Sequence, residues 1–147
     1  MRLQSAVFVL EDTLLAPDGS AREDLDKVLS LFKMEGVWLG AVTALRADEA
    51  QKALERAGLS SYFRFVLTED VALCGVDSST MFERAMKRLH GQKDDTAVFS
   101  GSLAAIEQAG EAGFRTVAVR GGADEEAWRA MRAAAAQSLE SYSELLG

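Results

Sequence analysis

Short apolar segments alternate with segments of helical periodicity along the whole chain, and this alternation restricts the possible folds more than any other feature. Strands that are buried on both faces of a parallel sheet read as continuous apolar runs, whereas the helices between them repeat with a period near 3.6. The pattern predicts an α/β fold, a Rossmann-like three-layer α/β/α sandwich around a five-stranded parallel sheet. The expected strands are Ala6–Leu10, Val37–Val42, Phe63–Leu67, Thr96–Phe99 and Thr116–Val119.

The segments between these strands carry signals for helix ends. Ser20 and Glu23 have capping-box spacing, which predicts a helix running from Ser20 to a stop near Gly36. In the tail, Trp128, Met131 and Ala135 form an apolar stripe that we expect to pack on the sheet, with a dimer surface as the alternative. The other expected helices and turns are Ala47–Ala57, Ser79–Gly91, Ser102–Gly113, Asp124–Ala135, a turn at Lys93–Asp95 and a last turn capped by Ser141 and Glu144.

Composition predicts one acidic domain covering residues 1–147. The formal net charge is −7, which argues against a nucleic-acid partner, because binding phosphate backbones requires a cationic surface. No apolar run approaches the roughly 20 residues of a membrane-spanning helix, so no membrane partner is expected. The polar start of the chain lacks a signal-peptide pattern, and the single cysteine, Cys74, cannot form an internal disulfide. We therefore expect a cytoplasmic protein.

Candidate functional residues follow the ends of the predicted strands. In a doubly wound fold the carboxyl ends of parallel strands meet at one edge of the sheet, and ligands bind there. That rule selects Glu11–Thr13, Thr43, Thr68–Asp70 and Ser100–Ser102. Thr43, Ser100 and Ser102 could hydrogen-bond an anion, although Ser102 also has the position of a helix cap. Glu11 and Asp12 form an acid pair, with solvated loop carboxylates as the alternative interpretation.

Four different sequence motifs follow one another along most of the chain. Residues Phe8–Leu14 read FVLEDTL, the second strand runs into Thr43, Ala53–Leu59 reads ALERAGL, and Leu103–Val117 reads LAAIEQAGEAGFRTV. Their order resembles the haloacid dehalogenase-like (HAD) superfamily, hydrolases that pass a phosphoryl group through an aspartate. In that family the first strand ends in Phe-Asp-x-Asp-Gly-Thr-Leu, and the second ends in a Thr or Ser that holds phosphate. The segment between Glu11 and Thr43 has room for one helix, so no cap domain is expected.

The resemblance places other residues at the positions that carry the family's chemistry. The nucleophilic Asp position is Val9, the acid/base position is Glu11, the phosphate-stabilising Lys position is Val76 and the magnesium-holding Asp position is Gly101. Phosphoryl transfer through an aspartate needs an attacking carboxylate, a second carboxyl group and cations that offset the developing charge. Valine cannot attack phosphorus, and magnesium prefers hard oxygen ligands. No metal site and no cofactor are expected, with Mg²⁺ implied only if the chain is an enzyme.

Three functions remain open from the sequence. The joint loss of the acids and the Lys favours a phosphatase-like pseudoenzyme that binds or regulates a protein partner, or self-associates. The first alternative is a weak or atypical phosphatase that uses Glu11 or Asp12, and the second is a structural subunit of an oligomer. Whether the chain is an enzyme is therefore left open by its sequence.

A second, less extensive resemblance is to response-regulator receiver domains. These end their first strand in an acidic pair, as Glu11 and Asp12 do, and need an Asp after the third strand and a Lys after the fifth. Asp70 lies slightly late for that role, and Arg120 occupies the place of the Lys. His90, at a helix end without metal-ligand neighbours, and the lone thiol of Cys74 are interpreted as structural.

Overall fold

The computed structural model describes residues 3–147, so Met1 and Arg2 of the predicted domain lie outside the described residues. Six parallel strands form a single sheet in the order β3-β2-β1-β4-β5-β6. This is the order of a doubly wound sheet in which the chain starts in the middle and moves first to one edge and then to the other. The strands are β1 (Ser5–Val9), β2 (Trp38–Thr43), β3 (Val66–Thr68), β4 (Thr96–Ser100), β5 (Arg115–Val119) and β6 (Gln137–Leu139).

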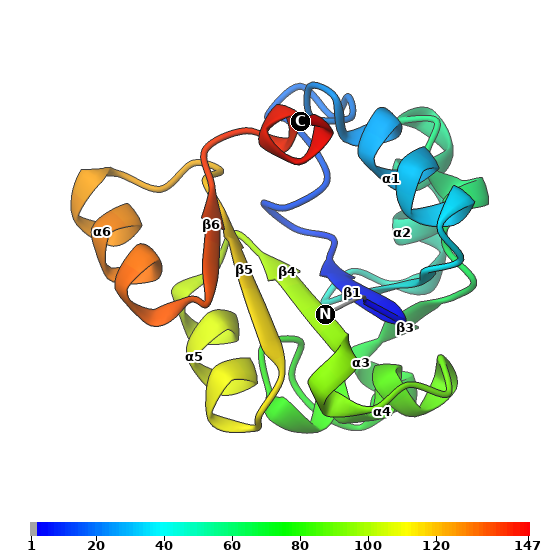
Figure 1. Ribbon diagram of the computed structural model, residues 1–147. Coiled ribbons are helices and arrows are strands. Elements are labelled where there is room, and N and C mark those ends of the chain that lie inside the picture. The colour runs from blue at the N-terminus through cyan, green and yellow to red at the C-terminus, as the bar shows by residue number, and fades with distance from the viewer. Residues whose placement is uncertain (1–2) are drawn as a thin grey trace.

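Helices cover both faces of this sheet, which confirms the predicted three-layer α/β/α architecture (Figure 1). One apolar cluster joins α1 and α2 to one face, and a second joins α4 and α5 to the other. No separate domain interrupts residues 10–37, which contain a loop and α1. The helices are α1 (Leu25–Met34), α2 (Ala47–Arg56), α3 (Glu69–Ala72), α4 (Ser79–Arg88), α5 (Leu103–Glu111) and α6 (Glu125–Ala134), with short 3₁₀ turns η1 (Ser60–Tyr62), η2 (Lys93–Asp95) and η3 (Tyr142–Leu146).

The central strands are buried along their whole length. Every residue of β1 and β4 is buried, as expected for parallel strands covered on both faces. On the α1 face the rings of Phe8 and Phe99 stack 4.4 Å apart, and Phe63 meets Phe8 edge-on at 5.9 Å. These aromatic contacts fix neighbouring strands and so position the loops that follow β1 and β4. Within the described residues, no helix is long and apolar enough to cross a membrane.

The sheet has six strands, whereas we predicted five. The additional strand, β6, pairs in parallel with Val117–Val119 of β5. It contains three residues, of which only Leu139 is buried, so its sequence is too short to show the alternation that identifies a strand.

The predicted capping box at Ser20 and Glu23 is wrong. The amide and hydroxyl groups of Ser20 donate to the carboxylate of Asp18 instead, at 3.0 and 2.6 Å. Helix α1 begins later, at Leu25, after Asp24 in a left-handed conformation (φ 64°) and without a side-chain cap. A local Asx turn therefore uses the serine that the sequence pattern had assigned to a helix end.

The third strand and the tail also differ in detail from the prediction. The predicted strand Phe63–Leu67 begins only at Val66, and the unpredicted helix α3 follows it directly. The stripe on α6 packs inside the molecule, where Trp128 and Met131 are buried in a cluster with Ile106 and Ala118. Packing inside the molecule is therefore confirmed for Trp128 and Met131, and Ala135 is partly buried against the same cluster.

Candidate functional site

The candidate site lies where the strand order reverses, at the carboxyl ends of β1 and β4. From β1 the chain moves to β2 and β3 on one side, and β4 leads to β5 and β6 on the other. A crevice outside the strand ends at such a reversal is the usual ligand site of doubly wound folds. The loops that flank it here are Glu11–Thr13 after β1 and Gly101–Ser102 after β4.

Glu11 reaches across this edge to the end of β2. The hydroxyl of Thr43 donates to Oε1 of Glu11 at 2.9 Å, and the backbone N–H of Ala44 donates to Oε2 at 2.6 Å. Thr43 is buried and also accepts the N–H of Leu45 at 3.0 Å, which orients its hydroxyl. The structure thus brings the predicted residues Glu11 and Thr43 together, as partners of one another.

The loop after β1 is also tied to the loop after β4. The hydroxyl of Thr13 donates to the carbonyl of Glu11 at 3.1 Å and accepts the N–H of Gly101 at 3.0 Å. Asp12 has a positive φ of 60°, a conformation that Asp and Asn adopt more readily than most side chains. Glycine is the residue that the family pattern has at this position, so the backbone keeps the turn while the side chain has changed.

This close approach leaves no room for a side chain at Gly101. A Cβ atom built there would lie 2.5 Å from the carbonyl oxygen of Asp12, and one built on Gly121 would lie 2.6 Å from the same oxygen. The β1 loop therefore rests directly on the backbone of the β4 and β5 loops. An aspartate at position 101, as in the family pattern, would require this loop to move.

Asp77 is a site residue that the sequence analysis missed. Burial raises its pKa, the negative charges of Glu11 and Glu69 raise it further, and a hydrogen bond with the Ser102 side chain opposes the shift. Glu69 in turn accepts the N–H of Val76 at 2.8 Å, which holds the loop before α4. Asp77 follows the position where the family has its lysine, so its charge is opposite in sign to the family's at this part of the site.

Two positions that carry charged residues in the family pattern, Val9 and Val76, are part of the apolar core in this chain. Val9 is 2% exposed and belongs to the cluster between the sheet and α4 and α5, and Val76 packs against the same cluster. Neither side chain offers a group that could attack phosphorus or bind a phosphate. The interior has thus replaced the charges of the family pattern with contacts between alkyl groups.

The residues present do not fit a magnesium ion. Among residues 3–147, no group of three or more His, Cys, Asp or Glu side chains is arranged to hold a metal. A carboxylate on residue 101 would meet the backbone of Asp12, and Val9 has no oxygen donor. Mg²⁺ requires several hard oxygen ligands in near-octahedral geometry, and this donor set does not provide them.

Ser100 and Ser102 have local partners. Ser100 is buried and its hydroxyl accepts the N–H of Ser102 at 3.0 Å. The hydroxyl of Ser102 accepts the N–H of Ala105 at 3.4 Å, as the N-cap of α5. The Ser102 hydroxyl, a candidate anion ligand, therefore caps α5. It also forms a hydrogen bond with Asp77.

Arg22 and Tyr142 also hold the β1 loop, and no sequence motif indicates either residue. Arg22 donates from Nη2 to the carbonyl of Asp12 at 3.2 Å, and its Nε is buried without a hydrogen-bond partner. The hydroxyl of Tyr142 donates to the carbonyl of Thr13 at 2.8 Å across 129 positions of sequence. Burial raises the pKa of Tyr142 far above its usual range, so this hydroxyl stays protonated as a donor.

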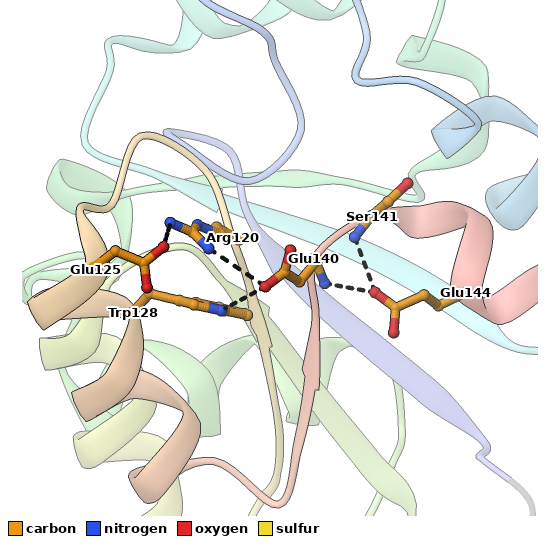
Figure 2. Close-up of polar contacts among 6 residues, drawn as sticks. All are labelled: Arg120, Glu125, Trp128, Glu140, Ser141 and Glu144. Atoms are coloured by element: carbon orange, nitrogen blue, oxygen red, sulfur yellow. Dashed lines mark hydrogen bonds and ion pairs between the residues drawn. The ribbon is translucent and has the colours of Figure 1, made fainter.

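The receiver-domain interpretation does not fit the structure. Receiver domains have the strand order 2-1-3-4-5, whereas β1 lies here between β2 and β4. Arg120 is also occupied: it donates to Glu125 at 2.7 Å and to Glu140 at 3.3 Å (Figure 2). The indole N–H of Trp128 donates to the same Glu140 at 3.2 Å (Figure 2). Arg120 therefore joins α6 to the tail.

Cys74 and His90 have local packing contacts. Cys74 is a half-buried free thiol that packs against the α4 and α5 cluster. His90 follows α4 in a left-handed conformation (φ 57°), and its ring meets Trp38 edge-on at 6.4 Å, where β2 begins. Both positions agree with the structural roles expected for them.

Comparison with known proteins agrees with the geometry of the fold. Residues 12–119 match the haloacid dehalogenase-like hydrolase family. No curated protein matches the sequence. Among solved structures, a dehalogenase is 23% identical with a TM-score of 0.73, and the match covers 86% of this chain and 55% of that one. The chain thus spans about half the length of that dehalogenase.

Two further structures match over almost their full length. The core domain of a provisionally named phosphoglycolate phosphatase from Streptococcus pneumoniae is 16% identical with a TM-score of 0.70, covering 99% of this chain and 94% of that one. A haloacid dehalogenase-like family hydrolase from the same species is 10% identical with a TM-score of 0.80, covering 98% and 97%. At these identities the likeness shows the fold alone.

Proposed function

This chain belongs to the haloacid dehalogenase-like hydrolase family, and we propose that it acts as a binding or regulatory domain without phosphoryl transfer. Its departures from the family pattern bear directly on this function. The observation that carries the proposal is the burial of Val9, which is 2% exposed at the position of the family's nucleophile. A buried alkyl group cannot form the covalent phosphoryl intermediate.

The surroundings of Val9 support the same proposal. Glu11, at the acid/base position, is held by Thr43 and Ala44, and Asp77 adds a negative charge where a phosphate would need a positive one. Like charges close to a transferring phosphoryl group would destabilise the transition state rather than offset its charge. Fold similarity alone does not carry an activity over when the site differs.

The partner in this proposal is a protein, either another chain or a second copy, in the cytoplasm. Val71 and Leu73 are 58% and 82% exposed at the end of α3, close in sequence to Glu69 and Asp77 of the site. Exposed large apolar side chains are typical of surfaces that contact other proteins.

A phosphatase assay tests the proposal. The purified chain is incubated with an aryl phosphate and Mg²⁺, and we expect no turnover above that of the buffer. Turnover that is abolished by Glu11→Gln or Asp12→Asn but retained in Glu111→Gln would overturn the proposal. Glu111 is the matched control because it is an exposed carboxylate at the far end of α5.

Two further measurements separate the alternatives. Mass spectrometry after exposure to beryllofluoride or a phospho-donor would detect an adduct on Glu11 or Asp12 if the chain were an atypical phosphatase, and we expect none. Light scattering coupled to size exclusion tests the structural-subunit alternative, for which a monomer at all concentrations would be the contradicting result. A self-associating regulatory domain predicts an oligomer that forms with increasing concentration.

A further inference from the structure

A tryptophan is exposed at the amino edge of the sheet, opposite the candidate site. Trp38 is the first residue of β2 and is 40% exposed, whereas the other tryptophan of the chain, Trp128, is 2% exposed. The guanidinium carbon of Arg64 lies 3.8 Å from the centre of the Trp38 ring, and the ring of His90 meets it edge-on at 6.4 Å. A cation–π pair and an edge contact therefore hold an exposed indole ring in one place.

Cationic side chains surround this ring. Lys33, in the last turn of α1, lines a groove of about 170 Å³ together with Trp38 and Arg64, and no carboxylate of the described residues lines that groove. The guanidinium carbon of Arg88, in the last turn of α4, lies 5.6 Å from the centre of the Phe65 ring. Among residues 3–147, Lys33, Arg64 and Arg88 are exposed and form no ion pair with a carboxylate. Lys33, Trp38, Arg64 and Arg88 are termed the cationic surface below.

The backbone makes this surface continuous. The ring of Phe65 rests on Gly40 of β2, where an added Cβ atom would lie 2.5 Å from the ring. Gly40 is two positions after Trp38, so both face the same side of the sheet. The N–H of Arg64 donates to the carbonyl of Leu39 at 2.8 Å, which fixes the segment before β3 beside the start of β2. The residues that carry the cations are thus held in register with the exposed indole ring.

The polar side-chain groups of the cationic surface are all hydrogen-bond donors. Guanidinium, ammonium and indole N–H groups donate and cannot accept, whereas an ionised carboxylate accepts and cannot donate. The indole N–H of Trp38 makes no hydrogen bond with any group of residues 3–147, so it can donate to a ligand. A complementary ligand therefore presents several carboxylates, as a run of Asp or Glu side chains does.

We infer that the cationic surface docks an acidic segment of a partner protein, whose carboxylates pair with the cations and accept the indole N–H of Trp38. The inference rests on the proposed binding function and adds the place and the chemistry of the partner. Nucleic acid fits this surface less well, because single strands bind by stacking bases on aromatic faces and Arg64 occupies a face of Trp38. The formal net charge of −7 also repels a phosphate backbone.

The test uses the peptide octaglutamate as the probe and the two indole N–H resonances of the chain as the readout. We expect octaglutamate to shift the indole resonance of Trp38, assigned with Trp38→Phe, and to leave that of the buried Trp128 unchanged. Octaglutamine, which has no charge, should shift neither resonance. Added salt should weaken binding of octaglutamate, because exposed ion pairs are screened. A dissociation constant for octaglutamate above about 1 mM would overturn the inference.

Two variants with the same change in net charge locate the bound peptide. Arg64→Gln combined with Arg88→Gln removes two cations from the surface, and we expect octaglutamate to bind at least about threefold more weakly, since an exposed ion pair contributes a factor of roughly 1.5 to 5. Arg129→Gln combined with Arg132→Gln removes two exposed cations from α6 and should have little effect. Equal losses in the two variants would show attraction to the whole molecule and would overturn the inference.

Two other results would assign the surface to a different occupant and so would also overturn the inference. Tighter binding of octauridylate than of octaglutamate would identify a nucleic-acid site. An oligomer of the wild type that Arg64→Gln combined with Arg88→Gln dissociates, as seen by light scattering, would identify a second copy of the chain. The phosphatase assay reports on the opposite edge of the sheet, so turnover would contradict the proposed function alone, whereas failure to bind octaglutamate would contradict this inference alone.

Discussion

At the scale of single residues, the site is defined by how its carboxylates are paired. Glu11 has two donors, whereas Asp77 lies among the charges of Glu11 and Glu69 with a hydrogen bond from Ser102 as compensation. The sequence indicated Glu11 because it ends a strand, but Asp77 lies in a loop with no recognisable spacing. Its importance follows only from burial and from charges that are distant in sequence, which no local pattern records.

Asp77→Asn should make stability less dependent on pH. Burial and neighbouring carboxylates raise the pKa of Asp77 in the folded state, so the folded protein keeps a proton that the unfolded chain has lost. Stability therefore falls as the pH rises from the unfolded value of about 3.9 through the raised folded value. We expect Asp77→Asn to be more stable than the wild type at pH 7, with the difference disappearing below about pH 3.9, as measured by urea unfolding.

Asp70→Asn is a control for which we expect the opposite change in stability at pH 7. A hydrogen bond from Thr68 lowers the pKa of Asp70, so its contribution to stability is present above the unfolded pKa and is lost as the pH falls through the folded value. We expect Asp70→Asn to be less stable than the wild type at pH 7 and equal to it in strong acid. Identical pH profiles for the two variants would contradict both assignments.

At the scale of helices and strands, the periodicity of the sequence located most of the core. The long apolar runs predicted β1, β2, β4 and β5 to within one or two residues, because burial on both faces leaves a continuous signal. Two short elements were not predicted from the sequence: β6 has three residues and α3 has four, too few to show a period. The start of α1 was misplaced because Ser20 bonds to Asp18, a competition between two local patterns that only the folded chain resolves.

Val9→Asp should destabilise the domain rather than restore a nucleophile. The side chain of Val9 is 2% exposed in an apolar cluster, so a carboxylate there would be buried without a partner. We expect the free energy of unfolding to fall by about 3 kcal/mol, as measured by urea denaturation at pH 7.

Val9→Thr is the control for Val9→Asp, since threonine has the shape of valine and adds a neutral hydroxyl. We expect it to lower the free energy of unfolding by about 1–2 kcal/mol, less than Val9→Asp does. A stable Val9→Asp variant that gains phosphatase activity would show that this position is still part of an active site.

Two of the helix-start signals of the chain, at Asp124 and Ser20, can be compared by alanine substitution. Asp124 accepts the N–H of Ala127 at 2.8 Å as the N-cap of α6, so Asp124→Ala should lower the free energy of unfolding by about 1 kcal/mol. Ser20 caps no helix, and its partner Asp18 is exposed, so Ser20→Ala should change stability by less than about 0.5 kcal/mol. Equal losses in the two variants would favour the capping box that the sequence suggested.

At the scale of the whole molecule, the C-terminal tail contacts the loop of the candidate site. The turn η3 lies against α1 (Figure 1). From this turn, the hydroxyl of Tyr142 donates to the carbonyl of Thr13 in the loop after β1. A polar network that includes Arg120 and Glu140 holds the approach to this turn, and the N–H groups of Glu140 and Ser141 donate to Glu144 (Figure 2). The tail therefore supports the loop that carries Glu11, a link that contacts across the sequence create and local patterns do not predict.

Tyr142→Phe tests whether the tail holds the site loop in place. Phenylalanine keeps the buried ring but removes the donor to the Thr13 carbonyl, which should lower the free energy of unfolding by about 1–2 kcal/mol. The loss should also loosen Thr13, so the amide of Gly101, which donates to the Thr13 hydroxyl, should exchange faster with solvent. Urea unfolding and amide exchange measure the two effects separately.

The only other tyrosine of the chain, Tyr62, provides the matched control. Its hydroxyl pairs with that of Ser30 at 2.9 Å, between η1 and α1, and makes no contact with Thr13. Tyr62→Phe should therefore reduce stability modestly without changing exchange at Gly101. Because global unfolding accelerates exchange everywhere, an effect on Gly101 that Tyr142→Phe produces and Tyr62→Phe does not must come from the loop itself. If both variants accelerate Gly101 equally, the tail contributes general stability and does not hold the site.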